Sequence, residues 1–261
     1  MFIHNFPSMG INFPLSSRYE SVDTFYFIVD TYRKDGAMSN NFTPSDEQND
    51  PQGRTGDMVQ ILATSLRGKI LSGELPAGQR VRESSIASDL NVSRATLREA
   101  LRLIERGGLI EKSPNRSYIV VRFNERDIFE LATLRTALEV MGARLALQRS
   151  YTSSALAAAI PAIASAAENR DLKSLAAADR RFHEILIECA DHRRLLESYH
   201  ALQDQIELAM LNVQKHELNI AGIADRHARL VALATNPDKF VEELYRHIRE
   251  GMGVSDISVL I

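Results

Sequence analysis

Four residues in the second half of the chain have the types and the spacing of a metal site: Asp179, His183, His227 and His247. Asp179 and His183 stand four residues apart in Asp-Arg-Arg-Phe-His, so on a helix they share one face. His227 and His247 fall on two later predicted helices, and a bundle can bring three helices together around a core site. Neutral imidazole binds Zn, Ni, Fe or Cu, and a carboxylate extends the range to Mn or Mg. Taken alone, an Asp-x-x-x-His pair is more often a salt bridge, so both interpretations stay open.

A second group of residues has the types and the spacing for binding DNA. Arg94 and Arg98 are four residues apart at the start of a predicted helix, so both project from one face. A guanidinium can bond two acceptors of guanine at once, which is the commonest base-specific contact. Ser93 and Thr96, together with the free N–H groups of that helix end, can bond phosphates. Arginines on short helices are usually solvated, but two on one face after a tight turn favour base recognition.

The elements around these arginines predict a winged helix-turn-helix over residues 57–123. Apolar residues at helical spacing, and the breaks between them, define three helices and a β-hairpin. The helices are expected from 57 to the turn at Gly73, at 83–89 and at 93–106, and the two strands at 109–112 and 118–121. Residues 90–92 form a three-residue turn before Ser93, whose side chain can cap the helix that follows.

The distribution of charge places a basic segment between two acidic ones. Residues 57–124 carry 11 Lys and Arg against 7 Asp and Glu, whereas residues 125–261 carry 16 against 20 and residues 1–56 carry 4 against 7. A local excess of basic residues is the electrostatic footprint of a nucleic-acid-binding segment. Arg82, just before the second helix, and Arg116, at the tip of the hairpin, are placed to bind phosphates.

Residues 124–251 are predicted to form an all-helical bundle of about six helices. The apolar periodicity predicts these helices at 125–150, 153–169, 171–190, 193–216, 219–235 and 238–250, followed by a loose tail over 252–261. Residues 1–56 are expected to be a disordered or poorly structured N-terminal extension, because 38–56 are polar and rich in helix breakers. Met38 is a candidate native start. The chain is therefore predicted to be mainly α.

Composition excludes several further classes of protein. The single cysteine, Cys189, excludes an internal disulfide and suits a reducing cytoplasm. No apolar run approaches the roughly 18–20 residues that a bilayer span requires. The sequence shows no basic segment followed by an apolar stretch, so we expect no secretory signal. We therefore expect a cytoplasmic protein without a membrane partner.

Residues 58–121 resemble the DNA-binding domain of the GntR family of transcription regulators. The most specific match is Asn-Val-Ser-Arg-Ala-Thr-Leu-Arg-Glu-Ala-Leu at 91–101, close to the family's Gly-Val-Ser-Arg-Thr-Pro-Val-Arg-Glu-Ala-Leu. The resemblance implies that the two arginines of this segment read bases and that its serine and threonine support them. It also implies a winged helix-turn-helix, in agreement with the pattern of elements.

Residues 125–250 resemble the FCD effector domain of FadR-like members of the same family. The resemblance is carried by the segments Leu134–Glu139, Asp179–His183, Asp225–His227 and Arg246–His247. Many domains of this class bind a divalent metal through one Asp and three His, which implies Zn, Ni, Mn or Fe at the four residues named first. The resemblance also implies that Arg135 binds a ligand carboxylate. The alternative is a structural ion pair between Arg135 and Glu139, four residues on.

These expectations describe a transcription regulator rather than an enzyme. A homodimer would bind a palindromic operator in double-stranded DNA, and a small carboxylate metabolite at the metal would change that binding. A metal-dependent enzyme acting on an organic acid would use the same ligands, although no separate nucleophile or general base stands at a recognisable spacing. An effector-independent architectural DNA binder would use the helical half only to dimerise. RNA binding is disfavoured because no aromatic stacking platform accompanies the basic segment.

Overall fold

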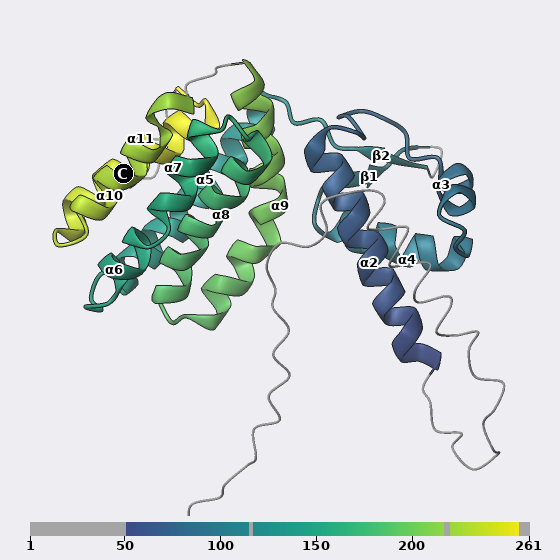
Figure 1. The fold of residues 1–261 in the computed structure, drawn as a ribbon, viewed down its shortest axis with the longest axis horizontal. Coiled ribbons are helices and arrows are strands. Elements are labelled where there is room, and N and C mark those ends of the chain that lie inside the picture. The colour runs from purple at the N-terminus through teal and green to yellow at the C-terminus, as the bar shows by residue number, and fades with distance from the viewer. Residues whose placement is uncertain (1–50, 115–116, 217–219, 256–261) are drawn as a thin grey trace, which may run out of the picture. The chain divides into compact units, whose positions relative to one another are not determined.

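The structure is a computed structural model that describes residues 51–114, 117–216 and 220–255. Residues 1–50 of the extension predicted over 1–56, with Met38, lie outside the described residues, as does Arg116 at the hairpin tip. Within the described ranges the chain is mainly helical and its strands form one hairpin, as the sequence predicts (Figure 1). None of the helices described is long and apolar enough to cross a membrane.

The N-terminal domain contains three helices and a hairpin, namely α2 (Pro51–Ser72), α3 (Glu83–Asp89), α4 (Arg94–Arg106), β1 (Ile110–Lys112) and β2 (Tyr118–Val120). The start of α2 at Pro51 precedes the predicted boundary at residue 57. Proline suits the first turn of a helix because its missing N–H needs no partner there. The two strands pair antiparallel, with Ile110 opposite Val120.

A tight turn joins α3 to α4 and sets the start of α4. Asn91 in this turn has φ of 50°, a left-handed conformation that asparagine tolerates better than most residues. The Ser93 side chain accepts a hydrogen bond from the Thr96 N–H at 3.0 Å, which confirms the predicted N-cap. One face of α4 is buried, through Leu97, Ala100, Leu101 and Ile104. The arginines at its start are left on the exposed side.

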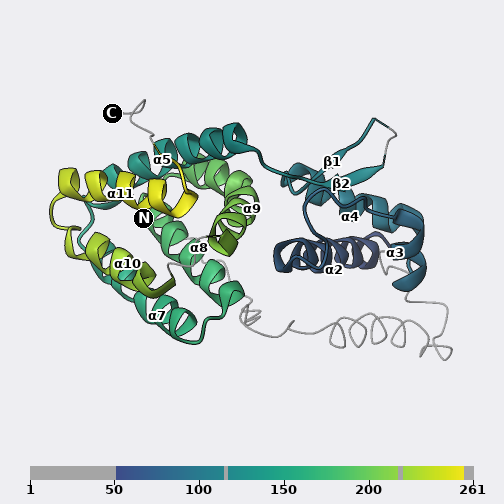
Figure 2. The same ribbon diagram turned by 90° about the horizontal axis from the view of Figure 1, so that it is seen from above.

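The C-terminal domain is an all-helical bundle of α5 (Glu125–Ala146), α6 (Thr152–Ala157), α7 (Ile160–Glu168), α8 (Leu172–Cys189), α9 (Arg193–His216), a 3-10 turn η1 (Ile220–Gly222), α10 (Ile223–Ala232) and α11 (Pro237–Met252). Helix α8 is central, since it packs against α5, α6, α7 and α9 (Figure 2). Helix α11 covers another side of α5. The core includes the buried side chains of Phe182, Leu186, Phe240 and Leu244.

The structure contradicts the prediction of one continuous helix over 153–169. This segment forms α6 and α7, with a break at Ala158 and Ala159. Pro161 explains the break, because proline has no N–H to donate to the carbonyl of Ala157 and its ring would clash with that carbonyl. In the structure Pro161 lies in the first turn of α7, where neither problem arises. The predicted helix 219–235 is likewise divided into η1 and α10.

Candidate metal centre

The four predicted metal ligands come together in the core of the bundle. Asp179 and His183 lie on α8, His227 on α10 and His247 on α11. One ligand atom from each residue lies within 4.8 Å of the other three. All four residues are buried, with at most 5% of their surface exposed. The helical bundle therefore brings one carboxylate and three imidazoles to a single point, which we call the Asp-His cluster.

Local sequence signals fix the helices that carry the cluster. Asp171 caps α8 and Asn236 caps α11, each with a side-chain oxygen that accepts backbone N–H groups of the first turn. Phe182, next to a ligand on α8, closes one side of the cluster. Its ring centroid lies 5.4 Å from that of His183 and 4.7 Å from that of His227, both edge-on. The cluster thus has an apolar wall that limits how the imidazoles can rotate.

The neighbours of two histidines determine which ring nitrogen carries the hydrogen. Nδ1 of His227 lies 2.8 Å from the carbonyl oxygen of Ile223, and a carbonyl can only accept, so Nδ1 is the donor. Nδ1 of His183 lies 2.7 Å from a carboxylate oxygen of Glu139 and donates in the same way. In a neutral imidazole the other nitrogen is then an acceptor. Both Nε2 atoms therefore hold lone pairs available to the cluster.

These lone pairs fit a cation. Nε2 of His227 lies 3.1 Å from Oδ1 of Asp179, so two acceptors face each other without a hydrogen between them. Nε2 of His183 lies 3.1 Å from Nε2 of His247. Nε2 of His227 and Nδ1 of His247 have no hydrogen-bond partner among the residues described. A divalent ion would satisfy Oδ1 of Asp179 and the Nε2 lone pairs of His227 and His183 at once. Three imidazoles with one carboxylate suit Zn, Ni, Mn or Fe.

The protonation states of the cluster also suit a metal. Burial lowers the pKa of His183. Burial and the neighbouring His227 and His183 hold the pKa of His247 well below its usual value. Burial raises the pKa of Asp179, but the charged groups around it, Arg135 among them, lower it by more, so this carboxyl stays ionised. Neutral imidazoles and an ionised carboxylate are the forms that coordinate metals.

Glu139 links two residues behind the cluster. One of its oxygens accepts from Nε of Arg135 at 2.6 Å, and the other accepts from Nδ1 of His183 at 2.7 Å. Burial opposes its ionisation, but Arg135 and His183 lower the pKa of Glu139 to about 2. The hydroxyl of Tyr199 donates to the same carboxylate at 3.4 Å. A carboxylate behind a metal-binding histidine fixes the orientation of the ring. The sequence alone does not predict this role for Glu139.

Arg135 forms the ion pair with Glu139 that the sequence left open as an alternative. It is 1% exposed, and its Nη1 also lies 3.2 Å from the sulfur of Met210. It lines a small cavity together with Asp179 and Tyr199. The predicted contact between Arg135 and a ligand carboxylate stays a prediction.

We expect Glu139→Gln to lower metal affinity about 10–100-fold, because an amide orients His183 less firmly than a carboxylate does. The substitution also leaves the buried Arg135 without a counter-charge, which costs about 3–5 kcal/mol in the free energy of unfolding. Metal titration and denaturant unfolding measure the two effects separately. The double variant Arg135→Met/Glu139→Gln should recover most of the stability and keep the low metal affinity. Unchanged metal affinity in both variants would contradict the role given to Glu139.

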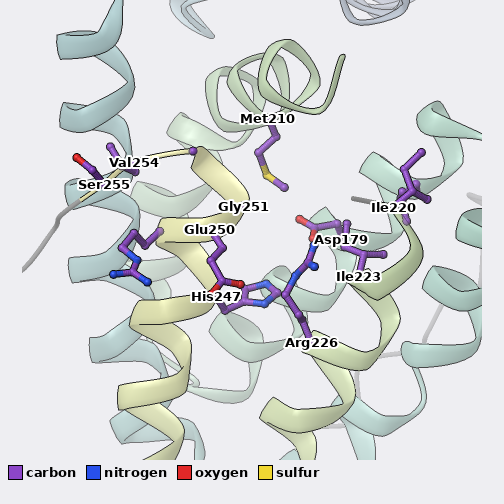
Figure 3. A pocket seen from close by; sticks show the side chains of 13 residues that line it. Asp179, Met210, Ile220, Ile223, Arg226, His247, Glu250, Gly251, Val254 and Ser255 are labelled. Carbon is purple, nitrogen blue, oxygen red and sulfur yellow. The ribbon is translucent and has the colours of Figure 1, made fainter. Parts of the chain in front are cut away.

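A pocket of about 580 Å³ opens beside the Asp-His cluster. Asp179 and His247 belong to its lining, so a molecule in the pocket can contact the Asp-His cluster (Figure 3). Arg226 and Glu250 add charged groups to the lining, and the sequence alone predicts neither as a site residue. The volume is within the range of roughly 300–1,000 Å³ that is usual for small-molecule sites. The cluster therefore has room for an organic ligand on one side.

The two predicted base-reading arginines lie together at the start of α4. Arg94 is exposed, and the side chain of Arg98 is 63% exposed. Nε of Arg98 donates to a carboxylate oxygen of Glu83 on α3 at 2.8 Å. Both guanidinium groups are thus at the surface, and that of Arg98 forms an ion pair with Glu83.

The structure describes three of the four residues predicted to contact phosphates. The hydroxyl oxygens of Ser93 and Thr96 lie 2.7 Å apart at the N-terminus of α4. Arg82 is exposed directly before α3. Arg116 lies outside the described residues, so the structure says nothing of its side chain. The structure groups Ser93, Arg94, Thr96 and Arg98 at the N-cap and in the first turns of α4.

Two sequence families match this chain over most of the described residues. Residues 59–120 match the family described as "Bacterial regulatory proteins, gntR family", and residues 130–250 match the "FCD domain". A relative from Paenarthrobacter nicotinovorans, named "Probable D-xylose utilization operon transcriptional repressor", is 29% identical over 69% of this chain and 80% of its own length. A regulator from Agrobacterium vitis, in the TAR-I ttuE-ttuC′ intergenic region, is 34% identical over 51% of this chain and 80% of its own.

Solved structures share the fold. A GntR transcriptional regulator from Rhodococcus sp. RHA1 is 21% identical, with a TM-score of 0.67 over 76% of this chain and 96% of that one. The E. coli protein McbR/YncC is 20% identical, with a TM-score of 0.60 over 78% of this chain and 96% of that one. At these identities the likeness concerns the fold alone. It agrees with a helix-turn-helix domain followed by a helical bundle.

Proposed function

Because this chain belongs to the GntR family and carries an FCD domain, we propose that a small metal-bound carboxylate controls its binding to operator DNA. The chain is a transcriptional regulator and not an enzyme, since its relatives and structural neighbours are regulators. The observation that carries the proposal is the buried Asp-His cluster beside a pocket of about 580 Å³. Repression is the proposed sign of regulation, because relatives that match this chain are named repressors.

Asp179, His183, His227 and His247 would hold the ion, and Glu139 and the carbonyl of Ile223 would orient two of the rings. When bound, the ion supplies open coordination positions for the oxygen atoms of a carboxylate ligand. Asp179 and His247 would lie nearest to that ligand, because both line the pocket. Arg135 remains the proposed second contact to the carboxylate, and it would reach a ligand only if its ion pair with Glu139 rearranges.

On DNA, α4 would enter the major groove, where Arg94 and Arg98 would contact base edges. Ser93, Thr96, Arg82 and Arg116 would contact phosphates, which position a protein without reading sequence. The ligand can change DNA binding only if it binds one arrangement of the protein more tightly than another. A DNA target also suits the cytoplasmic location expected from the sequence.

We further propose that the regulator binds its palindromic operator as a homodimer through an apolar face of α5. Leu134 is 47% and Met141 46% exposed, and they are seven residues apart on α5, two turns along one face. Leu138 lies between them and is half-buried. Exposed apolar side chains grouped in this way are typical of protein–protein contacts. A second copy of the chain is the occupant that a two-fold operator requires.

The double variant Leu134→Glu/Met141→Glu is therefore expected to be monomeric in light scattering at micromolar concentration, because burying two carboxylates in an interface is costly. Tyr151→Glu is the matched control, since Tyr151 is a large apolar residue with 51% exposure outside α5. That control should stay dimeric. A dimer in the α5 double variant, or a monomer in the unmodified protein, would overturn the proposed interface.

Thermal unfolding with a panel of organic acids tests the proposed function against an architectural DNA binder. Protein loaded with Zn, Ni, Mn or Fe should be stabilised by at least one acid, by about 2.7 kcal/mol at 100 times its Kd. Chelator-treated protein should show no such stabilisation. An architectural binder would respond to no acid with any of the four metals.

A further inference from the structure

Arg226 lies in the pocket, and no described residue pairs with it. It precedes the ligand His227 on α10, and its side chain is drawn beside those of Asp179 and His247 (Figure 3). Arg226 is half-buried, and among the residues described it makes no hydrogen bond or ion pair. By contrast, Arg229 on the same helix pairs with Glu243 at 3.2 Å. Within the described part of the chain, Arg226 is therefore an arginine at the pocket whose charge is left unpaired.

A half-buried guanidinium loses water contacts and gains nothing in return unless an anion binds to it. Arginine and carboxylate form hydrogen bonds that are strengthened by their charges and often bidentate. Because Asp179 and His247 line the same pocket as Arg226, one small molecule can reach the ion position and the guanidinium together. The ligand would then have an oxygen-rich end at the ion and an anionic group at Arg226.

The charges of the lining favour a ligand with two negative charges. Arg226 and Arg249 balance Asp179 and Glu250, so a divalent ion leaves the lining with two excess positive charges. A dicarboxylate neutralises this excess, whereas a monocarboxylate neutralises half of it. The apolar part of the lining, formed by Leu175, Met210, Ile220, Ile223 and Val254, can cover a short hydrocarbon chain between the two groups.

We propose that Arg226 binds a second carboxylate of the ligand, so that the pocket selects small dicarboxylic acids over monocarboxylic acids. This inference rests on the proposed function, because the first carboxylate binds at the metal ion. Arg226 is then a specificity-determining residue, separate from the four metal ligands. The acid sensed is then a short dicarboxylate, with one carboxylate at the ion and the other at Arg226.

Matched pairs of acids test the inference by calorimetry on metal-loaded full-length protein. The pairs are malate with 2-hydroxybutyrate, 2-hydroxyglutarate with 2-hydroxyvalerate, and 2-hydroxyadipate with 2-hydroxycaproate. Each pair shares its metal-binding end and differs by a carboxylate in place of a methyl group. For the pair of the best length, the diacid should bind about 10–100-fold more tightly, as expected for one charge-assisted contact.

Arg226→Gln should remove this difference by weakening the diacid, while the affinity for the monoacid and the metal content stay unchanged. Arg229→Gln is the matched control, because Arg229 lies on the same helix but pairs with Glu243 and is not part of the pocket lining, and it should keep the preference. Equal binding of diacid and monoacid, or a preference that survives Arg226→Gln, overturns the inference and leaves the proposed function standing. Binding of none of the six acids, or binding that is independent of metal, overturns the proposed function as well.

Discussion

Replacing His227 and His247 together with alanine is expected to abolish metal binding, reducing it from about one ion per chain to less than a tenth of that. The two histidines come from α10 and α11, so the double variant leaves only Asp179 and His183 on α8. Two ligands on one helix face cannot surround an ion, and affinity should fall by more than about 100-fold, beyond the effect of losing an orienting neighbour. Elemental analysis after dialysis measures the metal content.

The control for this variant is His192→Ala/His200→Ala, which removes two exposed histidines outside the cluster. That protein should retain its metal. The cluster variant should also lose the stabilisation that added metal gives to the wild type in thermal unfolding, since an ion that binds only the folded state stabilises it. If the His227→Ala/His247→Ala variant retained its metal, the proposed metal site would be contradicted.

Substituting Arg94 or Arg98 with alanine is expected to weaken operator binding by roughly 1–3 kcal/mol each and to relax base preference. Both guanidinium groups are exposed at the start of α4, where helix-turn-helix proteins contact base edges. Arg98 must exchange its ion pair with Glu83 for a base contact, so its measured effect should be the smaller of the two. Dissociation constants for the operator and for random duplex, at one fixed ionic strength, give the loss of operator affinity and the loss of base preference.

Arg102→Ala is the matched control for these substitutions. Arg102 is exposed on the same helix, but it lies further from the N-terminus and pairs with Glu99 at 2.5 Å. Its replacement should change operator and random duplex by the same small factor. If Arg94→Ala also weakened both equally, Arg94 would contact phosphate instead of bases.

The sequence predicted the parts of this protein that follow from local pattern. The N-cap Ser93 and the buried face of α4 follow from helical periodicity and capping chemistry, and both are present in the structure. The pairing of Asp179 with His183 needed only the four-residue repeat of one helix. Their meeting with His227 and His247 was not local, and it was expected from a family resemblance together with the general geometry of bundles.

The parts that the sequence did not predict depend on contacts between distant residues. Glu139 contacts His183, which is 44 residues further along the chain, and no local residue spacing predicts such a contact. In the sequence Arg226 resembles any surface arginine beside a histidine, and only the structure shows that it is half-buried in a pocket, with no partner in the ranges that are described. The break between α6 and α7 was predictable, because Pro161 is a local signal that outweighs the apolar periodicity around it.

The most direct test of the account is the dissociation constant for the protein's own promoter DNA, with and without the tightest-binding hydroxy acid. In metal-loaded wild type the acid should change this constant about 5–150-fold, the usual range for coupling between two sites. In the His227→Ala/His247→Ala variant the same acid should leave it unchanged. A constant that does not respond in metal-loaded wild type, or that responds equally in both proteins, would contradict control through the Asp-His cluster.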